Sequence, residues 1–111
     1  MREVTLANDA VKIRINGVVY KIIANDAEIV VMAENMKKEC AKILGSNPDA
    51  KAIVRAVKHI TESIDKVLGD GATAKISGGS PVTLKKAVEW FRVITNEAIA
   101  AFADKLEDEQ D

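Results

Sequence analysis

The sequence contains one cysteine, Cys40, and one histidine, His59. A single thiol cannot close an internal disulfide, and one thiol with one imidazole falls short of a metal-ligand cluster. Nucleophilic catalysis would also need a base within hydrogen-bond reach and a third, orienting group. We therefore expect no enzyme activity, no catalytic residue, no metal and no cofactor, and we interpret Cys40 as a small buried hydrophobe.

Long apolar runs are missing too, since none approaches the ~18 residues of a membrane-spanning helix. The first residues, M-R-E-V-T-L-A-N-D, do not follow the pattern of a signal peptide. Together with the lone thiol, these absences predict a protein of the reducing cytoplasm that has no membrane partner.

Aromatic residues make up only 4% of the chain, so the core should be aliphatic. The formal net charge is −1, which counts against a dedicated nucleic-acid binder because such proteins usually carry a basic excess. The hydrophobic fraction of 48% and the charged fraction of 30% are ordinary for a globular protein, and 111 residues suit a single domain.

The stretch I-R-I-N-G-V-V-Y-K, at residues 13–21, is the strongest local signal in the chain. Asn-Gly between alternating runs predicts a hairpin with a type I′ turn, here over residues 11–23. Six apolar residues should share its buried face: Val11, Ile13, Ile15, Val18, Tyr20 and Ile22. The other face should carry Lys12, Arg14 and Lys21, beside Val19 and Ile23. Residues 1–10 form an N-terminal segment in which Val4 and Leu6 could begin a further short strand.

Three helices should follow the hairpin, over residues 26–44, 48–68 and 81–105. Asn25 and Glu28 form a capping-box pattern at the first. Asn47-Pro48 and Ser80-Pro81 have the cap-then-proline pattern at the other two. The Gly-rich segment 69–80 should form turns, inside which A-T-A-K-I could form one short helical turn, and the acidic residues 107–111 should fray. The predicted fold is α+β, mostly α, with the hairpin packed on a three-helix bundle over residues 11–106.

Trp90 stands off the apolar stripe of its helix, because Phe91 occupies that stripe. Val93 lies near Trp90 on the second face, and Val30 and Val31 are likewise off the stripe of the first helix. Such a face indicates either a wider core or a protein interface, where aromatic anchors are common. We hypothesise that these four residues bind a protein partner or a second copy of the chain.

The basic face of the hairpin offers an alternative function. Lys12, Arg14 and Lys21 could contact nucleic acid, as some β-ribbons do. However, Val19 and Ile23 stand where such a protein would place polar donors. Lysines that discourage pairing at a solvated strand edge explain the same pattern.

Two ordered motifs suggest a relationship. The first is I-N-G-V-V-Y, with Ile15, Asn16, Gly17 and Tyr20. The second spans Leu68, Gly69, Gly71, Thr73, Ile76, Gly78 and Gly79, and precedes a helix containing V-E-W-F. This order resembles a family of small phage and prophage proteins from the tail-morphogenesis region, which show I-N-G-x-x-Y/F and F-G-E-G-T-x-x-x-I-F-G-G-like segments. The chain departs from that pattern in Leu68-Gly69-Asp70 and in Ser77, where an aromatic is common.

The resemblance implies a non-enzymatic role in tail assembly, as a chaperone or a minor structural component. It further implies phage tail proteins as partners, in the cytoplasm of a bacterial host. It supplies no catalytic or ligand-binding residue.

Overall fold

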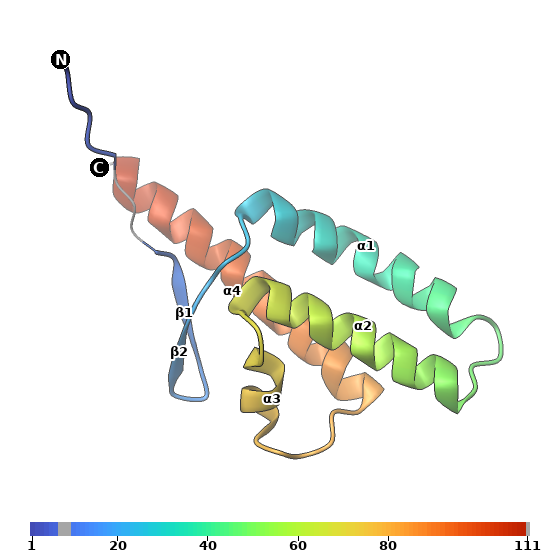
Figure 1. Cartoon of the computed structure of the whole chain (residues 1–111). Helices are drawn as coiled ribbons and strands as arrows, with labels where there is room; N and C mark the ends of the chain where they lie inside the picture. Colours follow the sequence, from blue (N-terminus) through green and yellow to red (C-terminus); the bar gives the residue numbers. More distant parts are fainter. Residues whose placement is uncertain (7–9, 111) are drawn as a thin grey trace.

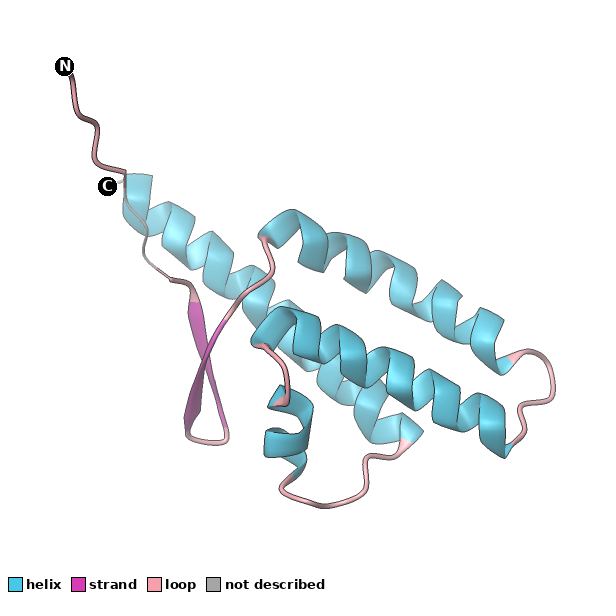
Figure 2. Ribbon diagram, in the orientation of Figure 1, coloured by secondary structure: helices cyan, strands magenta, loops and turns pink. Residues whose placement is uncertain are grey.

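The computed structural model describes residues 1–6 and 10–110. Its elements are β1 (Lys12–Ile15), β2 (Val18–Lys21), α1 (Asp26–Leu44), α2 (Ala50–Leu68), α3 (Ala72–Ser77) and α4 (Leu84–Gln110). Helices α1, α2 and α4 pack pairwise into a bundle, and the hairpin lies against α4 (Figure 1). Figure 2 shows that the helices dominate and that β1 and β2 form the whole sheet of the described chain. The predicted α+β, mostly α class is confirmed.

The hairpin forms as its turn signal predicts. Asn16 and Gly17 both have positive φ, at 51° and 80°, as a type I′ turn requires. The strands are antiparallel, with Ile13 opposite Tyr20 and Ile15 opposite Val18. The six apolar residues of the predicted inner face are buried or half-buried, and the charged residues of the outer face are exposed.

Helix α1 begins with the predicted capping box. The Asn25 side chain accepts a hydrogen bond from the Glu28 N–H at 2.8 Å, and Glu28 accepts one from the Asn25 N–H at 3.2 Å. Gly45 ends the helix and donates its N–H to the Ala41 carbonyl. Both predicted ends of this helix are confirmed.

The predicted starts of the other two long helices are wrong. Helix α2 begins at Ala50, where Asp49 rather than Asn47-Pro48 caps it and accepts from the Ala52 N–H at 2.8 Å. A carboxylate at this place also interacts favourably with the helix dipole. Helix α4 begins at Leu84, not at Pro81.

Thr83 accepts from the Lys86 N–H at 3.2 Å at the start of α4. Val82 lies just before the helix and packs against the core, and residues 81–83 are outside the helix. The other end of α4 was also mispredicted. The helix does not end near residue 105 but continues to Gln110, because its last residues are mostly good helix formers with no Gly or Pro among them.

The Gly-rich segment contains a fourth helix, α3, which has six residues and lies where the sequence predicts one short helical turn. Asp65 organises this region from the end of α2. One oxygen of its carboxylate accepts from the Thr73 N–H at 2.9 Å and from the Thr73 hydroxyl at 2.8 Å, and the other accepts from the Gly71 N–H at 3.3 Å. The segment is therefore an ordered connection rather than a loose loop.

The hairpin is tied to the helices next to this connection. The Ile23 N–H donates to the Val67 carbonyl at 2.8 Å, and the Lys75 ammonium lies 5.7 Å from the centre of the Tyr20 ring. The bundle core is aliphatic as expected, and its largest fully buried hydrophobic side chains are Ile29, Ile60, Ile64 and Val67.

Candidate functional site

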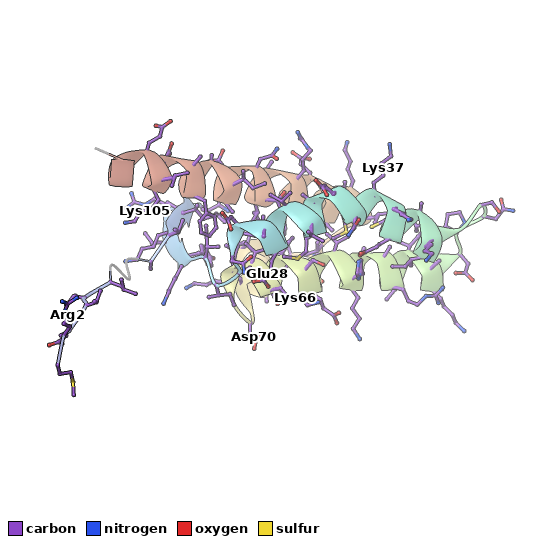
Figure 3. The ribbon with its side chains drawn as sticks, turned by 90° about the horizontal axis from the view of Figure 1, so that it is seen from above. Arg2, Glu28, Lys37, Lys66, Asp70 and Lys105 are labelled. Atoms are coloured by element: carbon purple, nitrogen blue, oxygen red, sulfur yellow. The ribbon has the colours of Figure 1, made fainter. Side chains whose placement is uncertain are left out.

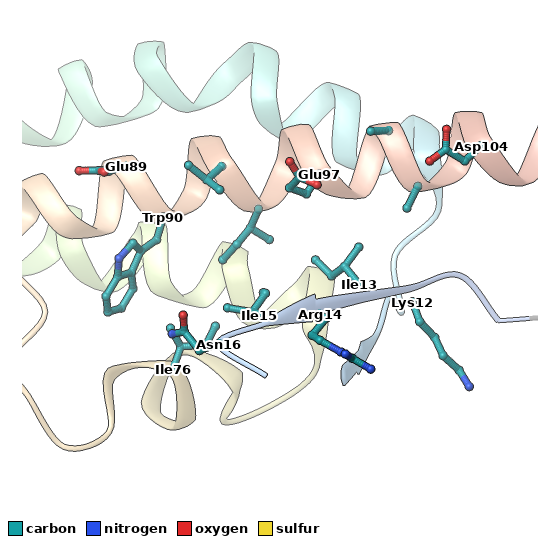
Figure 4. A pocket seen from close by; sticks show the side chains of 14 residues that line it. Lys12, Ile13, Arg14, Ile15, Asn16, Ile76, Glu89, Trp90, Glu97 and Asp104 are labelled. Atoms are coloured by element: carbon teal, nitrogen blue, oxygen red, sulfur yellow. The ribbon is translucent and has the colours of Figure 1, made fainter. Parts of the chain in front are cut away.

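A groove of about 680 Å³ lies between β1 and α4 (Figure 4). The hairpin supplies one side of it and α4 the other, while α3 closes one end with Ile76. Its apolar surface consists of Ile13, Ile15, Ile76, Trp90, Val93, Ile94, Ala100 and Ala101. Charged and polar side chains line the rest of the groove, so its surface is apolar along the floor and polar at the borders.

An acidic row borders the groove on the α4 side. It consists of Glu89, Glu97 and Asp104, which are eight and seven residues apart and so follow one side of the helix, about two turns from one to the next. Figure 4 shows these carboxylates along α4 and the Lys12 and Arg14 side chains beyond β1. Among the described residues none of these five charged groups forms an ion pair.

The edge of β1 that borders the groove is unpaired. Hydrogen-bonded and non-bonded pairs alternate along an antiparallel ladder. Since the Ile22 N–H donates to the Val11 carbonyl at 2.9 Å, Lys12 and Arg14 belong to non-bonded pairs and direct their N–H and C=O groups away from β2. Within residues 1–6 and 10–110, nothing bonds to these four backbone groups. The groove therefore offers a strand edge beside an apolar floor.

The structure brings Trp90 and Val93 together in this groove. Trp90 is half-buried and packs against the core, and its ring points toward Asn16 and Ile76 (Figure 4). Val93 is 46% exposed beside it. The off-stripe position of these two residues thus corresponds to a second face of α4, which is turned toward the hairpin.

Val30 and Val31 lie elsewhere, so the four hydrophobic residues do not form one surface. Val31 lines a separate hollow beside the end of the hairpin, and neither valine lines the groove. The reason is the way in which α4 is turned about its axis. Phe91 lies on the side of α4 that faces Met36 of α1, and the next side chain, Trp90, points about 100° away, toward β1.

The basic residues of the hairpin are also divided. Lys12 and Arg14 border the groove, whereas Lys21 on β2 does not, and all three side chains are exposed. The acidic row on α4 borders the same groove, so the groove carries both positive and negative charges. A phosphate backbone would meet repulsion there.

Cys40 and His59 show no catalytic arrangement. His59 Nε2 contacts the Glu39 carboxylate and so links α2 to α1. Burial, and then the negative charge of Glu39, raise the pKa of the Cys40 thiol, which makes it a poor nucleophile. In the part of the chain that the structure describes, no group of three or more His, Cys, Asp or Glu side chains could hold a metal ion.

The sequence reasoning missed the acidic row and the free edge of β1. The regular spacing of the three acidic residues is visible in the sequence of one helix. Whether they border a groove depends on which element packs beside that helix, and the spacing does not show this. The position of Ile76 at the end of the groove could not be predicted either, because a short helical turn at A-T-A-K-I does not show which element it packs against.

No helix among the described residues is long and apolar enough to cross a membrane. No curated protein and no solved structure matches the chain. One family model does match, over residues 16–110. The matched stretch includes β2, all four described helices and the α4 side of the groove. Because this match spans most of the chain, the protein belongs to the family of unknown function DUF6673.

Proposed function

We propose that this chain is a non-enzymatic protein that acts by binding another protein in the groove between β1 and α4. The observation that carries the proposal is the unpaired edge of β1 beside an apolar floor. An extended segment that adds to a free strand edge gains main-chain hydrogen bonds, and its alternate side chains enter the adjacent pockets. Trp90 would act as the anchor, as interface tryptophans often do.

The dimensions of the groove suit such a segment. Trp90 packs against the core on one side and borders about 680 Å³ of open volume on the other, so part of its ring is available to a bound segment. Val93, at 46% exposure, would become buried when a partner binds. Burying apolar surface of this kind contributes roughly 25 cal/mol per Å².

We further propose that the partner belongs to the tail-assembly proteins of a phage or prophage, in the cytoplasm of a bacterial host. The support is the resemblance carried by the hairpin and the Gly-rich motifs. The chain would serve there as a chaperone or a minor structural component.

The test is capture of defined partners by two matched variants. Phage tail proteins are co-expressed with the wild-type chain, with Val93→Glu in the groove, and with Val54→Glu on the outer face of α2, where Val54 is 65% exposed. We expect the wild type and Val54→Glu to retain the partner and Val93→Glu to lose it. Equal capture by both variants would exclude the groove as the site, and no capture by any chain would contradict the tail role.

Nucleic-acid binding through Lys12, Arg14 and Lys21 lacks a comparable observation, since the acidic row lies beside two of these residues. We expect no binding to duplex or single-stranded DNA or RNA at low salt. Tight binding that weakens steeply as salt rises would instead support that function.

A further inference from the structure

The N-terminal segment of the chain, residues 1–6, forms neither helix nor strand and is exposed throughout. Figure 3 places Arg2 well away from the bundle. Val4 and Leu6 are 77% and 79% exposed, so two large apolar side chains stand in water. They alternate with polar residues, which puts Arg2, Val4 and Leu6 on one side of an extended segment and Glu3 and Thr5 on the other.

We infer that this segment of one copy adds as a strand to the β1 edge of a second copy and fills its groove. The inference rests on the proposed function, because it names the occupant of the same protein-binding site. It makes a second copy the occupant of the groove when no tail protein is bound there.

Backbone chemistry provides the first part of the fit. Lys12 and Arg14 present two N–H and two C=O groups on the free edge. An added strand satisfies all four. A two-stranded sheet is marginal in water and a third strand stabilises it.

Side-chain chemistry provides the second part. With Val4 and Leu6 directed inward, their side chains meet the apolar floor around Trp90 and Ile94. Arg2 lies on the same side of the segment and can reach the acidic row.

The outward side of the segment is complementary as well. Glu3 would stand next to Lys12 and Arg14 on the exposed face of the enlarged sheet, and opposite charges on neighbouring strands attract. The opposite register would place Val4 and Leu6 in water and Glu3 over the apolar floor. Charge and polarity therefore select one face of the segment.

The spacings agree. Val4 and Leu6 are two residues apart on one side of the segment, as Lys12 and Arg14 are on the free edge of β1, so the segment and the edge share one strand repeat. The segment leads away from its own body (Figures 1 and 3), and the second copy presents an identical groove. A reciprocal exchange closes a dimer, whereas a one-way exchange produces a growing chain.

The first experiment measures mass by light scattering over a concentration series. We expect the wild type to self-associate, and the double variant Val4→Glu/Leu6→Glu to need more than about tenfold higher concentration for the same mass. Both residues are exposed, so the substitutions should leave the fold intact, as circular dichroism can verify. Val54→Glu is the matched control and should behave as the wild type.

The second experiment mixes two defective chains. Val4→Glu/Leu6→Glu keeps its groove, and Val93→Glu keeps its N-terminal segment. At a concentration at which the wild type associates, we expect each variant alone to be monomeric and the mixture to form a complex with a change in Trp90 emission. A mixture that stays monomeric would overturn the inference.

Other outcomes separate the alternatives. A wild type that is monomeric at every concentration, but whose Trp90 emission changes on Val4→Glu/Leu6→Glu, places the segment on its own β1 edge and overturns the exchange. If mass never depends on Val4 and Leu6 but Val93→Glu still loses a tail protein, the inference fails and the proposed function stands. If Val93→Glu affects neither mass nor capture, both fail.

Discussion

Removing one hydroxyl group at Thr73 should destabilise the whole protein measurably. The Thr73 side chain is 6% exposed, and its hydroxyl oxygen lies 2.8 Å from an Asp65 carboxylate oxygen and 3.2 Å from the Thr61 carbonyl oxygen. One proton can be donated to one acceptor at a time, and the shorter contact to the carboxylate is the stronger. Thr73→Val keeps the shape of the side chain and removes this bond.

The expected loss follows from the partners that Asp65 retains. A hydrogen bond to a charged group contributes about 1.5–3 kcal/mol. The carboxylate is half-buried and still accepts from the backbone N–H groups of Thr73 and Gly71, so water can compensate for part of the loss. We therefore expect Thr73→Val to lower the free energy of unfolding by about 1–2 kcal/mol.

Urea unfolding followed by far-UV circular dichroism measures this change, provided that the slope of the transition is unaltered. Thr61→Val is the matched control. The Thr61 hydroxyl bonds to the Lys58 carbonyl one turn earlier at an exposed site, and its removal should change stability by less than about 0.5 kcal/mol.

A double-mutant cycle with Asp65→Ala separates the pair from its surroundings. If the hydroxyl acts through Asp65, Thr73→Val should have little effect once Asp65 is replaced. An unchanged effect in that background, or a loss from Thr73→Val no larger than that of the control, would refute the assigned role of this bond.

Three further predictions use simple assays. Ile60 is fully buried, so Ile60→Ala should lower the free energy of unfolding by about 2–5 kcal/mol in the same urea assay. Val54 is exposed, so Val54→Ala should lower it by less than about 0.5 kcal/mol. Gly17→Ala should cost about 1–2 kcal/mol, since Gly17 has a φ of 80° with open space around it and only the backbone conformation opposes a side chain. Cys40 should react with a thiol reagent far more slowly in the folded than in the urea-unfolded chain. Its raised pKa also means that the unfolded chain releases the thiol proton first as pH rises, so stability should fall above about pH 9 in the wild type but not in Cys40→Ala.

The parts of the fold that could be predicted from the sequence depend on local chemistry. Asn16-Gly17 allows the turn, and alternation determines which side chains are buried, so the register of the hairpin followed without knowledge of the bundle. The capping box at Asn25 is equally local. The starts of α2 and α4 are not. Each had two competent capping residues a few positions apart, so the local pattern alone did not decide between them.

Only the α4 side of the candidate site could be predicted from the sequence. Helical periodicity placed Trp90 and Val93 off the stripe of α4, but periodicity does not say which element lies opposite. The bundle put β1 there and left Val30 and Val31 at another surface. A strand edge can be recognised as free only when the sheet is complete, so the backbone of Lys12 and Arg14 carried no signal in the sequence.

The groove follows α4 from Glu89 to Asp104, on a face that is turned toward the hairpin rather than toward α1 and α2. β1 supplies the opposite side, and α3 reaches one end of the groove with Ile76. Because the sheet of the described chain has two strands, the outer edge of β1 is left unpaired beside this groove. An N-terminal segment with matching alternation and charge is the one piece of the described chain that makes no use of its apolar side chains. Supplying it from a second copy would complete the sheet and bury Val4 and Leu6 in one step, which is why we place the exchange at this site.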